Sequence, residues 1–174
     1  MKEECYVKKA VVLDTSAILS GTINYLPFDT EIYIPQSVIM EVKDADSRYR
    51  LETSMQTGRV KILNPPTQIV NEVNRVSMSL GEALNLTQTD IEVVALAVYL
   101  HRSGYSVIVF SDDYSVQNLC KRFGLKFTPV KTTGIREVRR YIYKCTACSY
   151  VSDRLPYDKK CPICGSKLKR KRVS

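Results

Sequence analysis

Acidic side chains follow the two most apolar short segments of the chain. Asp14 ends the run AVVLD, and Asp112 and Asp113 follow the run SVIVF after a single serine. Glu41 and Asp90 stand in two other segments, each in the first turns of an expected helix. Carboxylates gathered in one cleft repel one another and need a counter-charge, which a hard divalent cation such as Mg²⁺ or Mn²⁺ supplies. Since such an ion can polarise a phosphate oxygen and activate water, these acids indicate phosphodiester hydrolysis.

Each of these acids also has a plain structural interpretation. Asp is a favoured helix N-cap worth about 1 kcal/mol, so Asp90 and either Asp112 or Asp113 could simply cap helices. Glu41 on its own is typical of a solvated helix residue. Asp14 is harder to explain as a cap, because it closes a buried strand. Caps do not explain why the acids stand at equivalent places, so a shared site is favoured.

Four of the six cysteines lie near the end of the chain, as CTAC and CPIC with twelve residues between the pairs. Two CxxC pairs on tight turns can supply four thiolates to one tetrahedral ion, and the spacing is slightly shorter than in common zinc sites. A rubredoxin-like iron site and disulfides are the alternatives, and a cytoplasmic chain disfavours disulfides. The pattern therefore predicts a structural Zn²⁺ ion held by Cys145, Cys148, Cys161 and Cys164.

The positive charge of the chain is concentrated in the same region. The net charge is +8 and the pI about 9.2, yet residues 141–174 hold nine Lys and Arg against two Asp, whereas the preceding residues hold 17 basic against 16 acidic. Lys and Arg contact phosphates and tyrosines stack on unpaired bases, so this region is expected to bind RNA. A solvated tail is the alternative for KLKRKR. The expected RNA-binding residues are Arg139, Arg140, Lys144, Lys167, Lys169, Arg170, Lys171 and Arg172.

Alternating strand and helix signals must position these side chains. The apolar runs AVVLD, EIYIP, VKIL, SVIVF and KFTPV alternate with helical segments, of which TQTDIEVVALAVYLHRSG is the strongest. This alternation predicts an α/β fold with a mostly parallel central sheet flanked by helices, and ligands bind such sheets beyond the carboxyl ends of the strands. Residues 1–136 are expected to form this domain, and residues 137–174 a small zinc ribbon with a basic tail.

Two further expectations concern the location of the protein and the role of its single histidine. No apolar run approaches the roughly 20 residues that a membrane span needs, and the first residues lack the apolar centre of a signal peptide, so a cytoplasmic protein without a membrane partner is expected. The single histidine, His101, is expected deep in the apolar helix, where it has a structural role and is no general base.

The stretches VVLDTSAIL, IMEVKD, TDIEVVALA and VFSDDYSVQN resemble, in order, the four acidic motifs of PIN-domain ribonucleases. With a CxxC and CPxCG ribbon behind them, they resemble the Nob-type (Nin-one-binding) endonucleases of ribosome assembly, in a compact form similar to archaeal members. The resemblance implies a metal-dependent endoribonuclease that matures the 3′ end of precursor small-subunit (16S) rRNA in the pre-ribosomal particle, together with a protein that positions the RNA. The implied catalytic acids are Asp14, Glu41, Asp90 and Asp112, supported by Thr15, Ser16, Ser111 and Asp113.

Two other functions remain open at this stage. A toxin-like PIN ribonuclease would carry the same acids, although the appended ribbon speaks against it. A non-catalytic RNA-binding assembly factor would use the acids only as helix caps.

Overall fold

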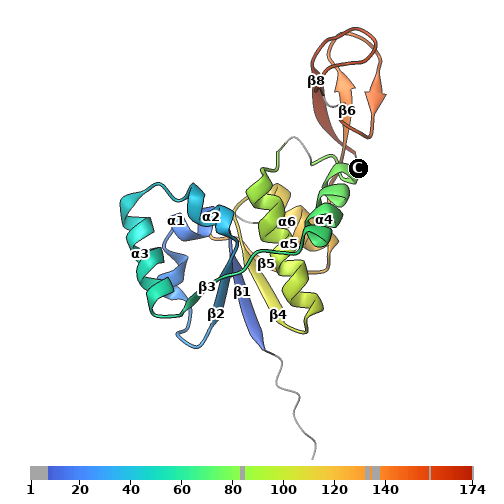
Figure 1. Ribbon diagram of the computed structural model, residues 1–174. Coiled ribbons are helices and arrows are strands. Elements are labelled where there is room, and N and C mark those ends of the chain that lie inside the picture. Colours follow the sequence, from blue (N-terminus) through green and yellow to red (C-terminus); the bar gives the residue numbers. More distant parts are fainter. Residues whose placement is uncertain (1–7, 83–84, 132–133, 135–137, 157, 174) are drawn as a thin grey trace, which may run out of the picture.

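The computed structural model describes residues 8–82, 85–131, 134, 138–156 and 158–173, and these form two separate sheets (Figure 1). The larger sheet has five strands in the order β3-β2-β1-β4-β5, and every pair in it is parallel. The expectation of an α/β fold with a mostly parallel sheet is therefore confirmed. Its strands are β1 (Lys9–Leu13), β2 (Glu31–Ile34), β3 (Val60–Ile62), β4 (Ser106–Phe110) and β5 (Lys126–Thr128).

Helices fill the connections between these strands and cover both faces of the sheet. In Figure 1, α1 to α3 lie to the left of the sheet and α4 to α6 to its right, as right-handed crossovers on the two sides of β1 require. These elements are α1 (Thr15–Leu19), the 3₁₀ turn η1 (Thr22–Tyr25), α2 (Gln36–Glu41), α3 (Ala45–Gln56), α4 (Thr67–Ser79), α5 (Gln88–Arg102) and α6 (Tyr114–Arg122).

The strand order reverses direction between β1 and β4. The chain builds β2 and β3 on one side of β1, and then crosses to place β4 and β5 on the other side. Ligands of open parallel sheets bind at such a reversal, outside the carboxyl ends of the two strands. The residues that follow Leu13 and Phe110 therefore share the edge of the sheet where a site is expected.

Helix α5 is the central helix of the core because it is apolar on nearly all sides. Its residues from Val93 to Ala97 are completely buried, and the helix packs on β1 and β4. The first turn of α5, with Asp90, is thereby held at the carboxyl edge of the sheet. The expectation for His101 is wrong: it lies exposed in the last turn of α5, which leads into the opposite edge of the sheet. Among the described residues, no helix is both long and apolar enough to cross a membrane.

The second sheet is antiparallel, with the order β7-β6-β8, and it lies beyond the end of α4 (Figure 1). Its strands are β6 (Arg140–Cys145), β7 (Val151–Ser152) and β8 (Leu168–Val173), and we call the unit that they form with the four cysteines the ribbon. Two hydrogen bonds join it to the turn after α4: Tyr141 N–H donates to the Leu80 carbonyl and Tyr143 Oη to the Gly81 carbonyl, each at 2.9 Å. The expected domain boundary between residues 136 and 137 lies outside the described residues.

Candidate active site and metal centre

Asp14 is the buried acid at the carboxyl end of β1, with a side chain that is only 5% exposed. Its Oδ1 accepts the Thr15 N–H at 2.5 Å, and its Oδ2 accepts the hydroxyls of Ser111 at 2.6 Å and Ser16 at 3.2 Å. Ser111 reaches it because β1 and β4 are adjacent. Burial raises the pKa of Asp14 despite these hydrogen bonds, and the charge of Asp113 adds to the rise.

Asp90 combines a capping role with a place among the acids. Its Oδ2 accepts the N–H of Thr87 at 2.7 Å and its hydroxyl at 2.8 Å, which completes a capping box at the start of α5. Burial raises the pKa of Asp90 to about 6, and the charges of Asp14 and Asp113 contribute to that rise. The cap interpretation is therefore correct for Asp90 but incomplete, because a cap alone does not bring three carboxylates within electrostatic reach.

Glu41 is the sixth and last residue of α2, within the first two turns of the helix that follows β2, as expected. Its side chain is exposed, and its Oε2 accepts the hydroxyl of Thr15 at 2.7 Å. Because Thr15 directly follows Asp14, this hydrogen bond links Glu41 to the buried acid. The three supporting hydroxyls expected from the sequence thus all bond to acids: Thr15 to Glu41, and Ser16 and Ser111 to Asp14.

The structure separates the two neighbouring acids after β4. Asp113 caps α6 through the N–H groups of Ser115 at 2.5 Å and Val116 at 3.3 Å, and its charge raises the pKa of both Asp14 and Asp90. Asp112 instead accepts the N–H groups that follow β5. The assignment of Asp112 as the metal ligand remains a prediction, whereas the mutual electrostatics favour Asp113. The two N–H groups bonded to Asp112 are those of Val130, at 2.9 Å, and Lys131, at 2.8 Å, so they hold its carboxylate against the segment after β5.

The acids at this edge fit a hard divalent cation by their chemistry. All the side chains concerned offer oxygen, and the negative charges of Asp14 and Asp113 raise the pKa of Asp90, so the group is short of positive charge. Mg²⁺ and Mn²⁺ prefer carboxylate oxygens and water as ligands.

The four cysteines of the ribbon meet at one point. Their sulfur atoms all lie within 4.8 Å of one another. Three Sγ–Sγ distances are 3.4 Å, 3.6 Å and 3.6 Å, far from the roughly 2.05 Å of a disulfide and close to the ~3.8 Å edge of a tetrahedron with 2.3 Å bonds. Hydrogen bonds from Ser166 lower the pKa of Cys164 to about 6, and the N–H of Ala147 lowers the pKa of Cys145. The four sulfur atoms are therefore placed to bind one metal ion.

Sequence reasoning missed Glu82, a carboxylate that is 1% exposed and lies between the ribbon and α6. It accepts the hydroxyl of Ser115 and the amide of Asn118, each at 2.8 Å, and forms an ion pair with Arg170 of β8. The only available signal was the pair Gly81-Glu82, which interrupts two helical patterns. The N–H of Ser115 also donates to Asp113. Through Ser115, Glu82 therefore links the ribbon to Asp113 in the acidic site.

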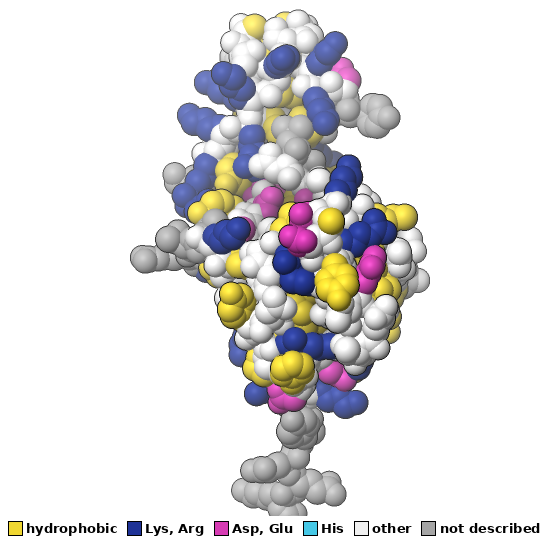
Figure 2. All heavy atoms as spheres, turned by 90° about the vertical axis from the view of Figure 1, so that its left-hand side faces the viewer, with side chains coloured by type: hydrophobic (Ala, Val, Ile, Leu, Met, Phe, Trp, Pro, Cys, Tyr) yellow, Lys and Arg dark blue, Asp and Glu magenta, His cyan; other side chains and the backbone are white. Residues whose placement is uncertain are grey.

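Most of the expected RNA-binding residues lie exposed on the ribbon. Figure 2 shows Lys and Arg side chains over the ribbon at the top of this face, with Asp and Glu side chains gathered below it in the middle. Two residues are already engaged: Arg170 pairs with Glu82 and stacks 3.9 Å from the Tyr141 ring centre, and Arg139 lies over the Tyr114 ring at 5.4 Å. The exposed ones are Arg140, Lys144, Lys167, Lys169, Lys171 and Arg172.

Comparison with known proteins places the chain among ribonucleases. A family model described as the PIN domain of ribonuclease matches residues 11–100. The chain is 39% identical over 168 residues to endoribonuclease Nob1 of Methanothermobacter thermautotrophicus, covering 96% of this chain and 94% of that protein. It is 34% identical over 160 residues to ribonuclease VapC1 of Thermoplasma acidophilum, covering 91% and 76%. The 20S-pre-rRNA D-site endonuclease NOB1 of Saccharomyces cerevisiae is 25% identical over 93 residues, covering 53% and 20%.

Proposed function

Because the chain belongs to the PIN-domain endoribonucleases of the Nob1 family, we propose that it matures the 3′ end of precursor 16S rRNA during ribosome biogenesis. The observation that carries the proposal is the electrostatic coupling of Asp14, Asp90 and Asp113 at the carboxyl ends of β1 and β4. Carboxylates whose negative charges raise the pKa of Asp90, beside a basic ribbon, suit an enzyme that cuts a polyanion with the help of a cation. In this proposal, residues 1–136 form the nuclease unit and residues 137–174 the ribbon.

Each residue of the site has a role in the proposal. Asp14, Asp90 and Asp113 hold the cation, and Glu41 completes the set from α2. The hydroxyls of Ser111 and Ser16 fix the rotamer of Asp14, and that of Thr15 draws Glu41 inward. A bound Mg²⁺ or Mn²⁺ ion would supply Lewis acidity towards the phosphate and its attacking water, so that hydrolysis leaves a 3′-hydroxyl.

The ribbon supplies RNA affinity in this proposal, with Zn²⁺ on its four cysteines. Lys144 and Lys169 stand directly opposite each other on β6 and β8. Like charges in cross-strand register destabilise a sheet, so this pair fits a surface whose partner is negatively charged. The partners are the precursor rRNA in its pre-ribosomal particle and an assembly protein that positions it, and the site of action is the cytoplasm.

The test is cleavage of a fragment that spans the 3′ end of precursor 16S rRNA. We expect one cut at the mature end with Mn²⁺ present, and its loss when Mn²⁺ is left out, a condition that spares the cysteine-bound metal. Asp14→Asn should lower the rate at least about 100-fold, because removing one catalytic charge costs several kcal/mol of transition-state stabilisation. Asp29→Asn is the matched control, since Asp29 is an exposed acid before β2, at the opposite edge of the sheet.

A second candidate is a ribonuclease that acts on transfer or messenger RNA, and the similarity to VapC1 favours it. That alignment covers 91% of this chain and so extends beyond residue 136, which means that the ribbon does not by itself separate the two functions. The RNA that the protein cuts distinguishes the two functions. Cuts in mature transfer or messenger RNA, with the rRNA fragment left intact, would replace the proposed function by this one.

A further inference from the structure

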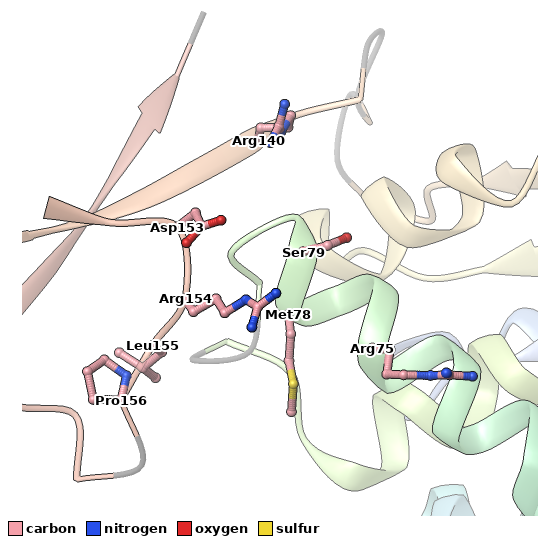
Figure 3. A pocket seen from close by; sticks show the side chains of 8 residues that line it. All are labelled: Arg75, Met78, Ser79, Arg140, Asp153, Arg154, Leu155 and Pro156. Atoms are coloured by element: carbon pink, nitrogen blue, oxygen red, sulfur yellow. The ribbon is translucent and has the colours of Figure 1, made fainter.

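A cleft of about 630 Å³ lies between α4 and the ribbon. None of the acids at the edge of the sheet lines it. Figure 3 shows Met78 on α4 and Arg154 on the segment that follows β7 on facing sides of the cleft, with Arg140 on β6 and with the Arg75 side chain extending along α4 away from that segment. Its volume is in the range of pockets that hold small organic ligands. The side chains that matter here are Arg75, Met78, Arg140, Arg154, Leu155 and Pro156.

The three arginines that line the cleft outnumber its one carboxylate, that of Asp153. No guanidinium of Arg75, Arg140 or Arg154 forms an ion pair within the described part of the chain. Arg75 interacts with the charge of Glu72, but both oxygens of that carboxylate already accept from Arg102, at 2.7 Å and 2.8 Å. Three free guanidinium groups on one cleft fit a phosphate-bearing ligand, which arginine binds through paired N–H donors.

The remaining lining distinguishes a nucleotide from a bare phosphate. Met78 is 49% exposed, a large apolar side chain at the mouth of the cleft, and the half-buried Leu155 and Pro156 face it from the ribbon. Flat apolar walls and guanidinium planes are what unpaired bases stack on. Asp153 adds a carboxylate, which can accept hydrogen bonds from the amino edge of a base.

We propose that the cleft between α4 and the ribbon is a subsite for an unpaired nucleotide of the RNA substrate, distinct from the acidic site. The inference rests on the proposed function in taking RNA as the ligand. A short chain segment connects the two sites: Ser79 lines the cleft, and Glu82, three residues later, bonds to Ser115 beside Asp113. One strand of RNA can therefore contact both sites across the base of the ribbon.

The experiment measures binding without cleavage. The zinc-loaded Asp14→Asn protein is titrated with a fluorescein-labelled single-stranded RNA of about ten nucleotides and, separately, with inorganic polyphosphate. Arg75→Gln and Arg154→Gln should each weaken RNA binding about 5- to 10-fold and reduce the salt slope by about one. Arg122→Gln, an exposed arginine in the last turn of α6, removes the same charge elsewhere and should change the affinity less than about twofold.

The apolar wall is tested with Met78→Gln, which keeps the length of the side chain. It should weaken RNA binding about threefold or more and leave polyphosphate binding unchanged, because only a base stacks on this wall. Equal effects of the Arg154 and Arg122 substitutions, or equal losses of RNA and polyphosphate in the Met78 variant, would overturn the subsite. A cleft that takes an acidic peptide instead would leave RNA affinity unchanged in all the variants. Failure of rRNA cleavage with these contrasts intact would refute the proposed function alone.

Discussion

At the scale of single residues, the two adjacent acids after β4 have different surroundings. Asp113 shares its electrostatic field with Asp14 and Asp90, whereas Asp112 accepts two N–H groups of the segment after β5. The same substitution should therefore affect mainly the cleavage rate at Asp113 and mainly the stability at Asp112.

We predict that Asp113→Asn lowers cleavage at least about 100-fold with little loss of stability, because asparagine retains an oxygen that can cap α6. Asp112→Asn should lower cleavage far less and cost about 1 kcal/mol of stability, since a neutral oxygen accepts more weakly. Single-turnover rates and urea unfolding of both variants check the pair. The reverse order of activities would restore Asp112 as the ligand, as first expected from the sequence.

Asp90 predicts a dependence of stability on pH. Its folded-state pKa is raised to about 6, so the stability it contributes is complete below the unfolded value of 3.8 and is lost as the pH rises through 6. Asp90→Asn should thus stabilise the protein at pH 7.5 without added divalent ion, by about 1 kcal/mol after discounting for its partial exposure.

The same substitution should abolish the stabilisation that Mn²⁺ gives the parent protein. Urea unfolding at pH 5 and pH 7.5, with and without Mn²⁺, measures both effects. An Asp90→Asn variant less stable than the parent at pH 7.5 would mean that the capping box with Thr87 outweighs the repulsion.

At the scale of elements, a glycine in the turn after α4 lets that turn pack closely against β6 of the ribbon. Gly81 has a φ of +72°, and a Cβ there would lie 2.5 Å from the carbonyl oxygen of Tyr141. Gly58 has the same φ, with nothing within 4 Å of the corresponding position. An alanine at either position would therefore have the same backbone strain, but only the alanine at position 81 would collide with a neighbouring residue.

We predict that Gly58→Ala costs about 1 kcal/mol of stability and that Gly81→Ala costs at least about 2 kcal/mol. The additional loss should come with faster proteolytic separation of the ribbon, because the collision falls on the backbone of β6. Urea unfolding and limited trypsin digestion measure the difference. An equal loss of stability in the two variants would contradict this prediction, because it would mean that the ribbon can move away from α4 without loss of stability.

The elements themselves follow from local patterns, and their mutual placement does not. The run SVIVF predicts β4 because consecutive apolar residues suit a strand buried on both faces. The helix that contains Glu41 ends there instead of continuing, since Asp44 caps α3 and so divides the expected helix. The buried role of Glu82 was hidden because its partners, Ser115 and Arg170, lie 33 and 88 residues away in sequence.

At the scale of the whole molecule, the ribbon has too small a core to fold alone. Among its described residues, the buried core consists of Tyr143, Cys145, Cys161 and Leu168, and two of these belong to the four-cysteine cluster. The larger unit has a separate core built on α5, β1 and β4.

Removal of the Zn²⁺ ion proposed for the four cysteines should therefore unfold the ribbon and leave the larger unit intact. We expect RNA affinity to fall at least about 10-fold, because the basic side chains lose their arrangement, while Mn²⁺ still stabilises the larger unit. Circular dichroism, RNA binding and thermal unfolding with and without Mn²⁺ follow these effects. Return of RNA affinity with added Zn²⁺ is the control, and unchanged affinity after removal would show that the ribbon does not contact RNA.

The hydrogen bond between Ser111 and Asp14 joins residues that are 97 positions apart. During synthesis, β1 emerges early, but Asp14 at its carboxyl end lacks the Ser111 hydroxyl until β4 has been made and has inserted beside β1. The acids meet only when most of the larger unit has been translated, since loop closure of this length precedes the contacts that stabilise it. A nascent ribonuclease of this topology therefore lacks its assembled acids until β4 has been made.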